Sequence, residues 1–89
     1  MKVYRLDHED GGGPFMTADG YSRTGGFHLD DGYLSCCLSL ESLQNWFREH
    51  DDVDLSKCEV HIYEVPWEDI IKGTTHFYFP KKYKYKGED

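Results

Sequence analysis

Glycines and cationic side chains gather in the first third of the chain, where they could bind an anion. Gly11–Gly13 form a run of three, and Arg5, Arg23 and His28 lie nearby in the sequence. Glycine-rich backbone can present N–H groups to an anion without any side-chain motif. A triphosphate loop is excluded, because Pro14 stands where such a loop needs a helix with a Lys-Ser or Lys-Thr pair. Two interpretations stay open: a loop that contacts an anion or nucleotide, and a loop that is only held down by its aromatic residues.

A second group of chemically active side chains lies on two expected strands in the second half of the chain. His61 and His76 alternate there with apolar residues. If the two strands pair, the imidazoles share a surface with Tyr63 and Tyr78, which would suit stacking of a base or of a partner's side chain. The alternative is that both histidines are ordinary, half-exposed strand residues.

The chain carries no signature of catalysis or metal binding. The run His8–Asp10 places three potential ligands side by side, but adjacent residues rarely chelate one metal well, so a solvated turn is expected. Serine, cysteine and histidine are present without the spacing of a nucleophile elbow. The three cysteines are an odd number with two adjacent members, Cys36 and Cys37, which favours reduced, structural thiols. We therefore predict a protein that is not an enzyme and holds no metal or cofactor.

Charge is distributed unevenly along the chain. The net charge is −7; residues 1–70 hold five Lys and Arg against fifteen Asp and Glu, whereas residues 71–89 hold five Lys against two acids. An acidic body argues against non-specific binding of nucleic acid, which needs Lys and Arg to displace counterions. It permits a basic protein partner, or it only keeps the protein soluble. With no apolar run of about 18 residues and no signal-peptide pattern, we expect no membrane span and a cytoplasmic protein.

Periodic apolar residues predict an α+β fold. Leu40, Leu43, Trp46 and Phe47 form one amphipathic stripe, and Ser39 precedes them at the position of an N-cap. We expect a small, mainly antiparallel sheet of about four strands with one amphipathic helix packed on it and a long glycine-rich loop. The expected elements are a strand at 1–6, the loop at 7–32, a strand at 33–38, the helix from 40 to near 50, a strand at 58–65, a helical turn at 67–72 and a strand at 74–79.

Residues 1–80 are expected to form a single α+β domain, and residues 81–89 a basic tail that alternates lysine with tyrosine. This tail could extend a strand, bind an acidic surface or fray at the chain end. Small domains bury a smaller fraction of their surface than large ones do, so a partner or a homo-oligomer could add stability. The oligomeric state stays open.

Several segments resemble a family of small uncharacterised phage and prophage proteins. The segments are Tyr4–His8, Gly13–Phe15, Ser39–Phe47, Val60–Val65 and His76–Phe79. Members of that family carry a Tyr-Arg strand, a Gly-Pro turn and a helix with the pattern Ser-Leu-Glu-x-Leu-x-x-Trp-Phe. The chain departs at Ser42, where the family often has Gln or Glu, and at Phe77, where it often has Gln. The resemblance implies an accessory, anti-defence role during infection.

The layout also has a faint, fold-level similarity to a trimmed ADP-ribosyltransferase fold. Arg5 and Ser35 or Ser39 would take the places of an Arg or His on the first strand and a Ser ahead of a helix. The late strand at 74–79 has no acid, so the catalytic Glu of that fold is missing. This similarity implies that binding of an NAD-like ligand could survive without transfer activity.

These patterns together favour a non-enzymatic binder that sequesters a nucleotide or an NAD-derived signalling ligand. Arginine would grip the phosphate, and tyrosine or histidine would stack on the base. Two alternatives stay open: an acidic inhibitor whose residues 51–54 and 64–69 dock on a basic host defence protein, and a residual ADP-ribosyltransferase-like activity. The predicted ligand-binding residues are Tyr4, Arg5, His8, Gly13, Pro14, Tyr21, Arg23, His28, Ser35, His61, His76 and Tyr78.

Overall fold

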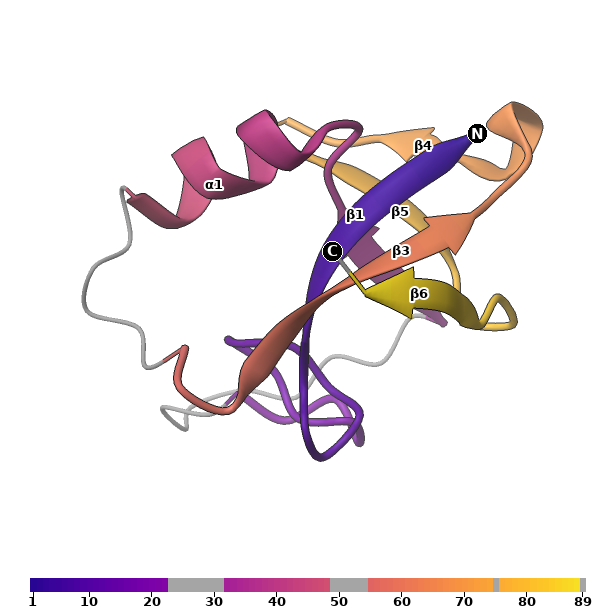
Figure 1. The fold of residues 1–89 in the computed structure, drawn as a ribbon. Helices are drawn as coiled ribbons and strands as arrows, with labels where there is room; N and C mark the ends of the chain where they lie inside the picture. Colours follow the sequence, from indigo (N-terminus) through magenta and orange to yellow (C-terminus); the bar gives the residue numbers. More distant parts are fainter. Residues whose placement is uncertain (23–31, 49–54, 75, 89) are drawn as a thin grey trace.

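In the computed structural model, the described residues form two three-stranded sheets and one α-helix (Figure 1). The description covers residues 1–22, 32–48, 55–74 and 76–88, without the side chains of 86–88. The α+β class, the antiparallel pairing and the amphipathic helix confirm the predicted fold class. The elements in chain order are β1 (Lys2–His8), β2 (Tyr33–Cys36), α1 (Leu40–Arg48), β3 (Cys58–Glu64), the 3₁₀ helix η1 (Trp67–Asp69), β4 (Ile71–Lys72), β5 (Phe77–Pro80) and β6 (Tyr85–Glu88).

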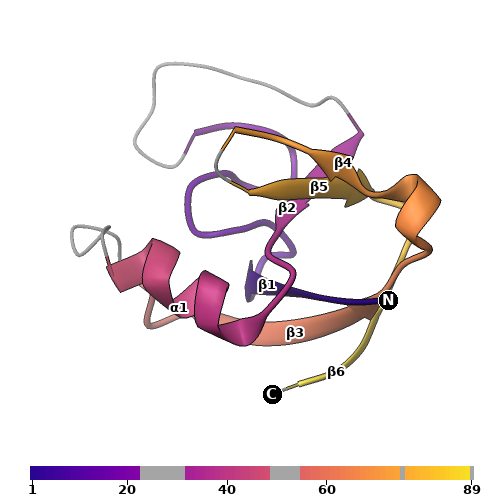
Figure 2. The same cartoon turned by 90° about the horizontal axis from the view of Figure 1, so that it is seen from above.

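Both sheets are antiparallel, and they lie as two layers (Figure 2). The strand order is β1-β3-β6 in the first sheet and β2-β5-β4 in the second. The pairing of β1 with β3 runs from Lys2 opposite Glu64 to His8 opposite Cys58. The two sheets meet where Tyr4 of β1 exchanges two main-chain hydrogen bonds of 2.8 Å with Cys37, the residue that follows β2.

The apolar core consists of two clusters that meet at the end of β2. Neighbouring residues of an extended chain point to opposite faces, so Cys36 enters one cluster and Cys37 enters the other. The first cluster draws on both sheets, and the second lies under the helix. The first is Val3, Cys36, Tyr63, Val65 and Phe79, and the second is Cys37, Leu43 and Phe47.

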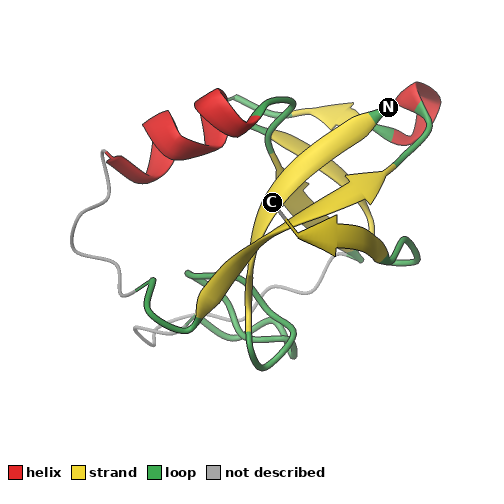
Figure 3. Ribbon diagram, in the orientation of Figure 1, coloured by secondary structure: helices red, strands yellow, loops and turns green. Residues whose placement is uncertain are grey.

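The helix α1 begins where its sequence predicts, and the end expected near His50 lies outside the described residues. The Ser39 hydroxyl accepts a hydrogen bond from the Ser42 main-chain N–H at 3.1 Å, which caps the first turn. Leu43 and Phe47 are buried against Leu6 and other residues on the face of the first sheet that is turned away from the second sheet. Figure 3 shows α1 lying at one side of the strands. No helix among the described residues is long and apolar enough to cross a membrane.

Three segments near the C-terminus differ in detail from the expected elements. Residues 67–72 form η1 and then β4, because Ile70 adopts an extended conformation that ends the helical turn. The strand expected at 74–79 runs from Phe77 to Pro80, and proline is tolerated there because it stands at the strand's end. The tail forms β6, which pairs with β3 across a bulge. The tail was expected to extend a strand, bind an acidic surface or fray; instead of extending β5 it forms a strand of its own at the edge of the first sheet.

Candidate ligand-binding site

Four polar side chains of β1 and β3 meet on the face of the first sheet that is turned toward the second sheet. Because side chains alternate along a strand, Arg5 and Asp7 share this face with each other, as do His61 and Tyr63. The antiparallel register places Arg5 directly opposite His61. All four residues are buried, with exposed fractions between 5% and 9%. We call them the polar cluster; their burial costs free energy unless each group is hydrogen-bonded.

Asp7 is the central acceptor of the polar cluster. Its Oδ1 accepts from Arg5 Nε at 2.5 Å, and its Oδ2 accepts from the Tyr63 hydroxyl and from His61 Nδ1, the latter at 2.8 Å. Because an ionised carboxylate only accepts, His61 carries a proton on Nδ1. Arg5 Nη1 donates to the main-chain oxygen of Ser35 at 2.9 Å and to its hydroxyl at 3.3 Å. Burial, followed by the hydrogen bond to Asp7, raises the pKa of Tyr63.

The glycine run satisfies its own amides within the loop. The N–H groups of Gly11–Gly13 donate at 2.9 Å to His8, Asp10 and Met16, in that order. A Cβ atom on the second glycine would lie 2.4 Å from a main-chain oxygen, and one on the third would lie 3.1 Å from Arg5 Nη2. The glycines therefore allow the chain to pack closely against itself and against the polar cluster. Their amides are not presented to an anion in this structure.

A cavity of about 980 Å³ adjoins the polar cluster. Its wall takes residues from both sheets, the glycine run, α1 and the tail, and its volume is in the range of ligand sites, roughly 300–1,000 Å³. One part of the wall is aromatic: the rings of Trp46 and His76 stack at 4.5 Å, and His76 lies 4.9 Å from the Tyr78 ring. Burial lowers the pKa of His76, which favours the neutral imidazole. Such a wall is suited to a planar ring.

The structure places the predicted site residues in three groups. Tyr4 packs against the cluster under α1, and Tyr21 is exposed, so neither lines the cavity. Arg23 and His28 lie outside the described residues. The others all line the cavity: Arg5, His8, Gly13, Pro14, Ser35, His61, His76 and Tyr78.

The two histidine strands do not pair. β3 belongs to the first sheet and β5 to the second, so the surface that depended on their pairing does not form within one sheet. His61 is buried, and Tyr85 of β6 stacks on its ring at 3.8 Å and 11°. His76 reaches the same cavity from the segment before β5. The two imidazoles therefore share a cavity wall rather than a sheet surface.

Sequence reasoning missed Asp7 and the tail as parts of this wall. Lys81, Tyr83, Lys84 and Tyr85 all line the cavity. A signal for Asp7 was present, because strand alternation puts it on the same face as Val3, which is apolar. For the tail, the alternation of lysine with tyrosine was a strand pattern, but only the paired structure shows which neighbour it meets.

The run His8–Asp10 forms a local turn. The His8 Nδ1 atom accepts a hydrogen bond from the Asp10 main-chain N–H at 3.2 Å, and the two acidic residues are exposed. This agrees with the solvated turn that the sequence favours. In the parts of the chain that the structure describes, no three metal-ligating side chains come together.

Only part of the site that the ADP-ribosyltransferase analogy requires is present in the described part of the structure. Arg5 and Ser35 contact each other, as the analogy would require, but both belong to a buried hydrogen-bonded network. β5 reads Phe-Tyr-Phe-Pro and supplies no carboxylate. β5 therefore does not supply the late-strand acid of that fold.

Comparison with protein families identifies the chain's relatives. Residues 1–86 match the model of the family described as Bacteriophage T4 Y00F protein, so the chain belongs to this phage protein family. The expected resemblance to a phage family is confirmed at that level, whereas similarity to ADP-ribosyltransferases is not shown. Searches of curated proteins and of solved structures gave no match.

Proposed function

We propose that this phage-family protein is a non-enzymatic accessory protein that captures a nucleotide or an NAD-derived signalling ligand in its cavity. The observation that carries the proposal is the cavity wall, where an aromatic part could stack on a base and cationic side chains could hold a phosphate. Stacking of a base on an aromatic side chain contributes about 1–3 kcal/mol and tolerates different bases. By removing a signalling nucleotide from the host cytoplasm, such a protein would weaken a defence response during infection.

In this proposal Arg5 stabilises the cavity wall and does not bind the phosphate, although the sequence favours phosphate binding. Its guanidinium donates to Asp7 and to Ser35, so these donors are already committed to the protein. Substitution of Arg5 would therefore disturb folding as well as binding. A test of the ligand needs side chains that line the cavity without holding the fold together.

The two tryptophans come nearest to such a test, because the chain has only these two. Trp46 also packs against the second core cluster, so the melting temperature of Trp46→Leu is measured beside its affinity. Trp46 lines the cavity, whereas Trp67 is 61% exposed and is not part of the wall. In Trp67→Leu protein, fluorescence reports on Trp46 alone. Titration with cyclic nucleotides and ADP-ribose derivatives should then change its emission and release heat in a calorimeter. Trp46→Leu should bind about tenfold more weakly, which corresponds to one lost stacking contact.

Two outcomes would contradict the proposal. One is the absence of heat and of any emission change with every ligand of the panel, together with no retained small molecule in the native mass spectrum of protein from infected cells. The other is equal ligand affinity in Trp46→Leu and Trp67→Leu, because the ligand would then lie outside the aromatic part of the cavity.

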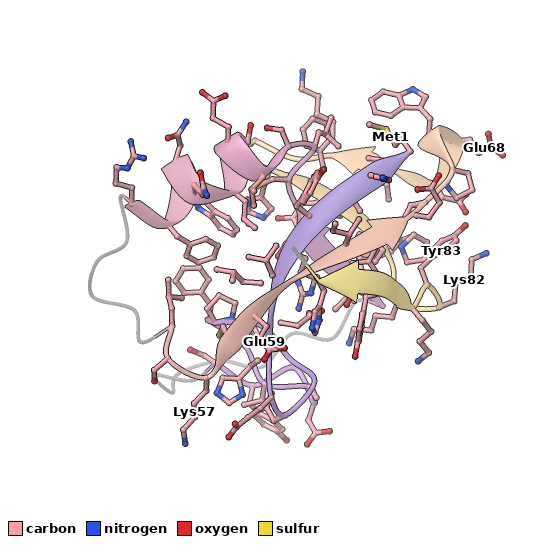
Figure 4. All side chains as sticks on the ribbon, viewed as in Figure 1. Met1, Lys57, Glu59, Glu68, Lys82 and Tyr83 are labelled. Carbon is pink, nitrogen blue, oxygen red and sulfur yellow. The ribbon has the colours of Figure 1, made fainter. Side chains whose placement is uncertain are left out.

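An exposed tryptophan between acidic residues favours a second candidate, an inhibitor that docks on a basic host defence protein. Trp67 lies between Glu64 and Glu68, both of which are exposed, and Figure 4 marks the position of Glu68. Tryptophan is enriched among the residues that dominate binding energy at protein interfaces. The other predicted acidic segment, residues 51–54, lies outside the described residues. Capture of a host protein that is lost at high salt and in Trp67→Leu would support this candidate over the first.

A further inference from the structure

We infer that the basic tail supplies the anion-binding part of the cavity, and that Lys84 is the side chain that contacts a ligand's phosphate group. The inference rests on the proposed function and specifies its ligand class, a compound that carries at least one phosphate next to an aromatic ring. It also assigns a ligand contact to residues 81–85, for which the sequence alone leaves several alternatives open.

Two carboxylates of the described cavity wall, Asp7 and Glu9, each lie beside an arginine or a lysine. The neighbouring positive charge weakens their repulsion of an anion, whereas the neighbour of Glu59 is the Nε2 atom of an imidazole. The closest approaches are those of Asp7 to Arg5 at 2.5 Å, Glu59 to His61 at 3.5 Å and Glu9 to Lys57 at 3.9 Å.

The charge of Lys84 is not neutralised by any carboxylate of the described residues. Lys84 lines the same wall and has no ion pair with any residue in the described parts of the chain. Of the described lining residues, four are lysine or arginine and three are aspartate or glutamate, although the chain as a whole has a net charge of −7. The wall therefore carries a local excess of positive charge within an acidic protein. A local excess of one sign of charge attracts ions of the opposite sign, so an anion is the ligand chemistry that fits the wall beside Lys84.

The tail is anchored in a way that keeps Lys84 at the wall. Tyr83 donates a hydrogen bond to Asp69 on one side, and Tyr85 stacks on the imidazole of the polar cluster on the other. Both tyrosines also line the cavity, so a phosphate at Lys84 would lie close to aromatic rings. Lys82 belongs to the same tail but is not part of the wall; its ammonium lies 4.0 Å from Asp69, and it points outward into solvent (Figure 4).

This difference makes Lys82 a matched control for Lys84. Lys84→Gln and Lys82→Gln each remove one positive charge from the same exposed tail, so any diffuse attraction of anions changes equally. We would titrate inorganic pyrophosphate and ADP into each protein by calorimetry at two salt concentrations. Lys84→Gln should weaken binding of both probes about tenfold, as expected for one charged hydrogen bond. Lys82→Gln should stay within about twofold of the native protein, and Lys84→Arg should retain most of the affinity.

The outcomes separate this inference from the proposed function. Equal loss in Lys84→Gln and Lys82→Gln, or no binding of either probe to the native protein, would overturn the inference. Nucleotide binding that quenches Trp46 but is unaffected by Lys84→Gln would also overturn it, while leaving the proposed function intact. Pyrophosphate binding that depends on Lys84, without binding of any nucleotide, would support the anion site and remove the nucleotide as its ligand.

Discussion

Replacement of Arg5 by methionine tests whether the polar cluster is held together by its ion pair. The substitution keeps a side chain of similar length and removes the guanidinium. Asp7 then keeps hydrogen bonds from Tyr63 and His61 but loses the charge that compensates its own. The main-chain oxygen of Ser35 loses a donor as well. Because Asp7 is buried, water can replace the lost partner only in part.

The expected loss of stability is large for a domain of this size. Removal of one partner from a buried ion pair costs about 3–5 kcal/mol. A domain of 89 residues has a free energy of unfolding of roughly 4–13 kcal/mol, taking about 0.05–0.15 kcal/mol per residue. Arg5→Met should therefore lose at least about a quarter of that free energy. With an m-value of about 1–1.5 kcal/mol/M, its urea midpoint should fall by about 2 M or more.

Urea unfolding followed by tryptophan fluorescence measures this loss, with an exposed ion pair as control. Lys57 lies 3.9 Å from Glu9, and both side chains are mostly exposed, so Lys57→Ala should cost less than about 1 kcal/mol. The double variant Arg5→Met with Asp7→Asn should regain part of the loss, because no charge is then left buried while the amide oxygen can still accept a hydrogen bond from Tyr63 or His61. If Arg5→Met shifts the midpoint no further than Lys57→Ala does, the polar cluster is not a buried paired unit and the reasoning is refuted.

Three further predictions follow from buried groups. Because the pKa of Tyr63 is raised in the folded protein, the neutral hydroxyl contributes stability that is fully present below the ordinary pKa of 10.0 and is lost as the pH rises above that value. Between about pH 9 and about pH 11, the urea midpoint should therefore fall less for Tyr63→Phe than for the native protein. Equal falls would contradict this prediction. Gly12→Ala should lower stability by about 1–3 kcal/mol, because the new Cβ would lie 2.4 Å from main-chain atoms of the loop; an unchanged melting temperature would show that the loop opens freely. Burial raises the pKa of Cys36 to about 12, so this thiol should be alkylated at least about tenfold more slowly near neutral pH than the half-buried Cys58. Peptide mapping measures both rates, and equal rates would argue against the burial of Cys36.

The helix and the main strands could be predicted because their signals are local. The apolar stripe of α1 and its cap at Ser39 lie within ten residues of one another, and both are present in the structure. The buried face of β3 was harder to predict from the sequence, because His61 and Tyr63 form a polar face when hydropathy is considered alone. They are buried since partners on β1 satisfy their hydrogen bonds, and hydropathy contains no information about partners.

The site depends on contacts between residues far apart in the sequence. His61 and Tyr63 meet Asp7 across 54 and 56 positions, and Arg5 meets Ser35 across 30. Arginine on the first strand was predicted to bind a phosphate, because its planar guanidinium suits phosphate and carboxylate groups. Whether it does so depends on what else reaches its donors, and here a neighbouring carboxylate and a main-chain oxygen occupy them.

By itself, the sequence determined the fold class, the helix with its cap, the acidic body with its basic tail and the resemblance to phage proteins. The first three of these features follow from residue type and short-range periodicity, which folding does not change, and the resemblance is carried by the motifs themselves. Only the tertiary structure decided which charges are paired, which glycine amides are used and where the tail lies. Each of these depends on strand register, because a shift of one residue would turn every side chain to the opposite face and exchange all of its partners.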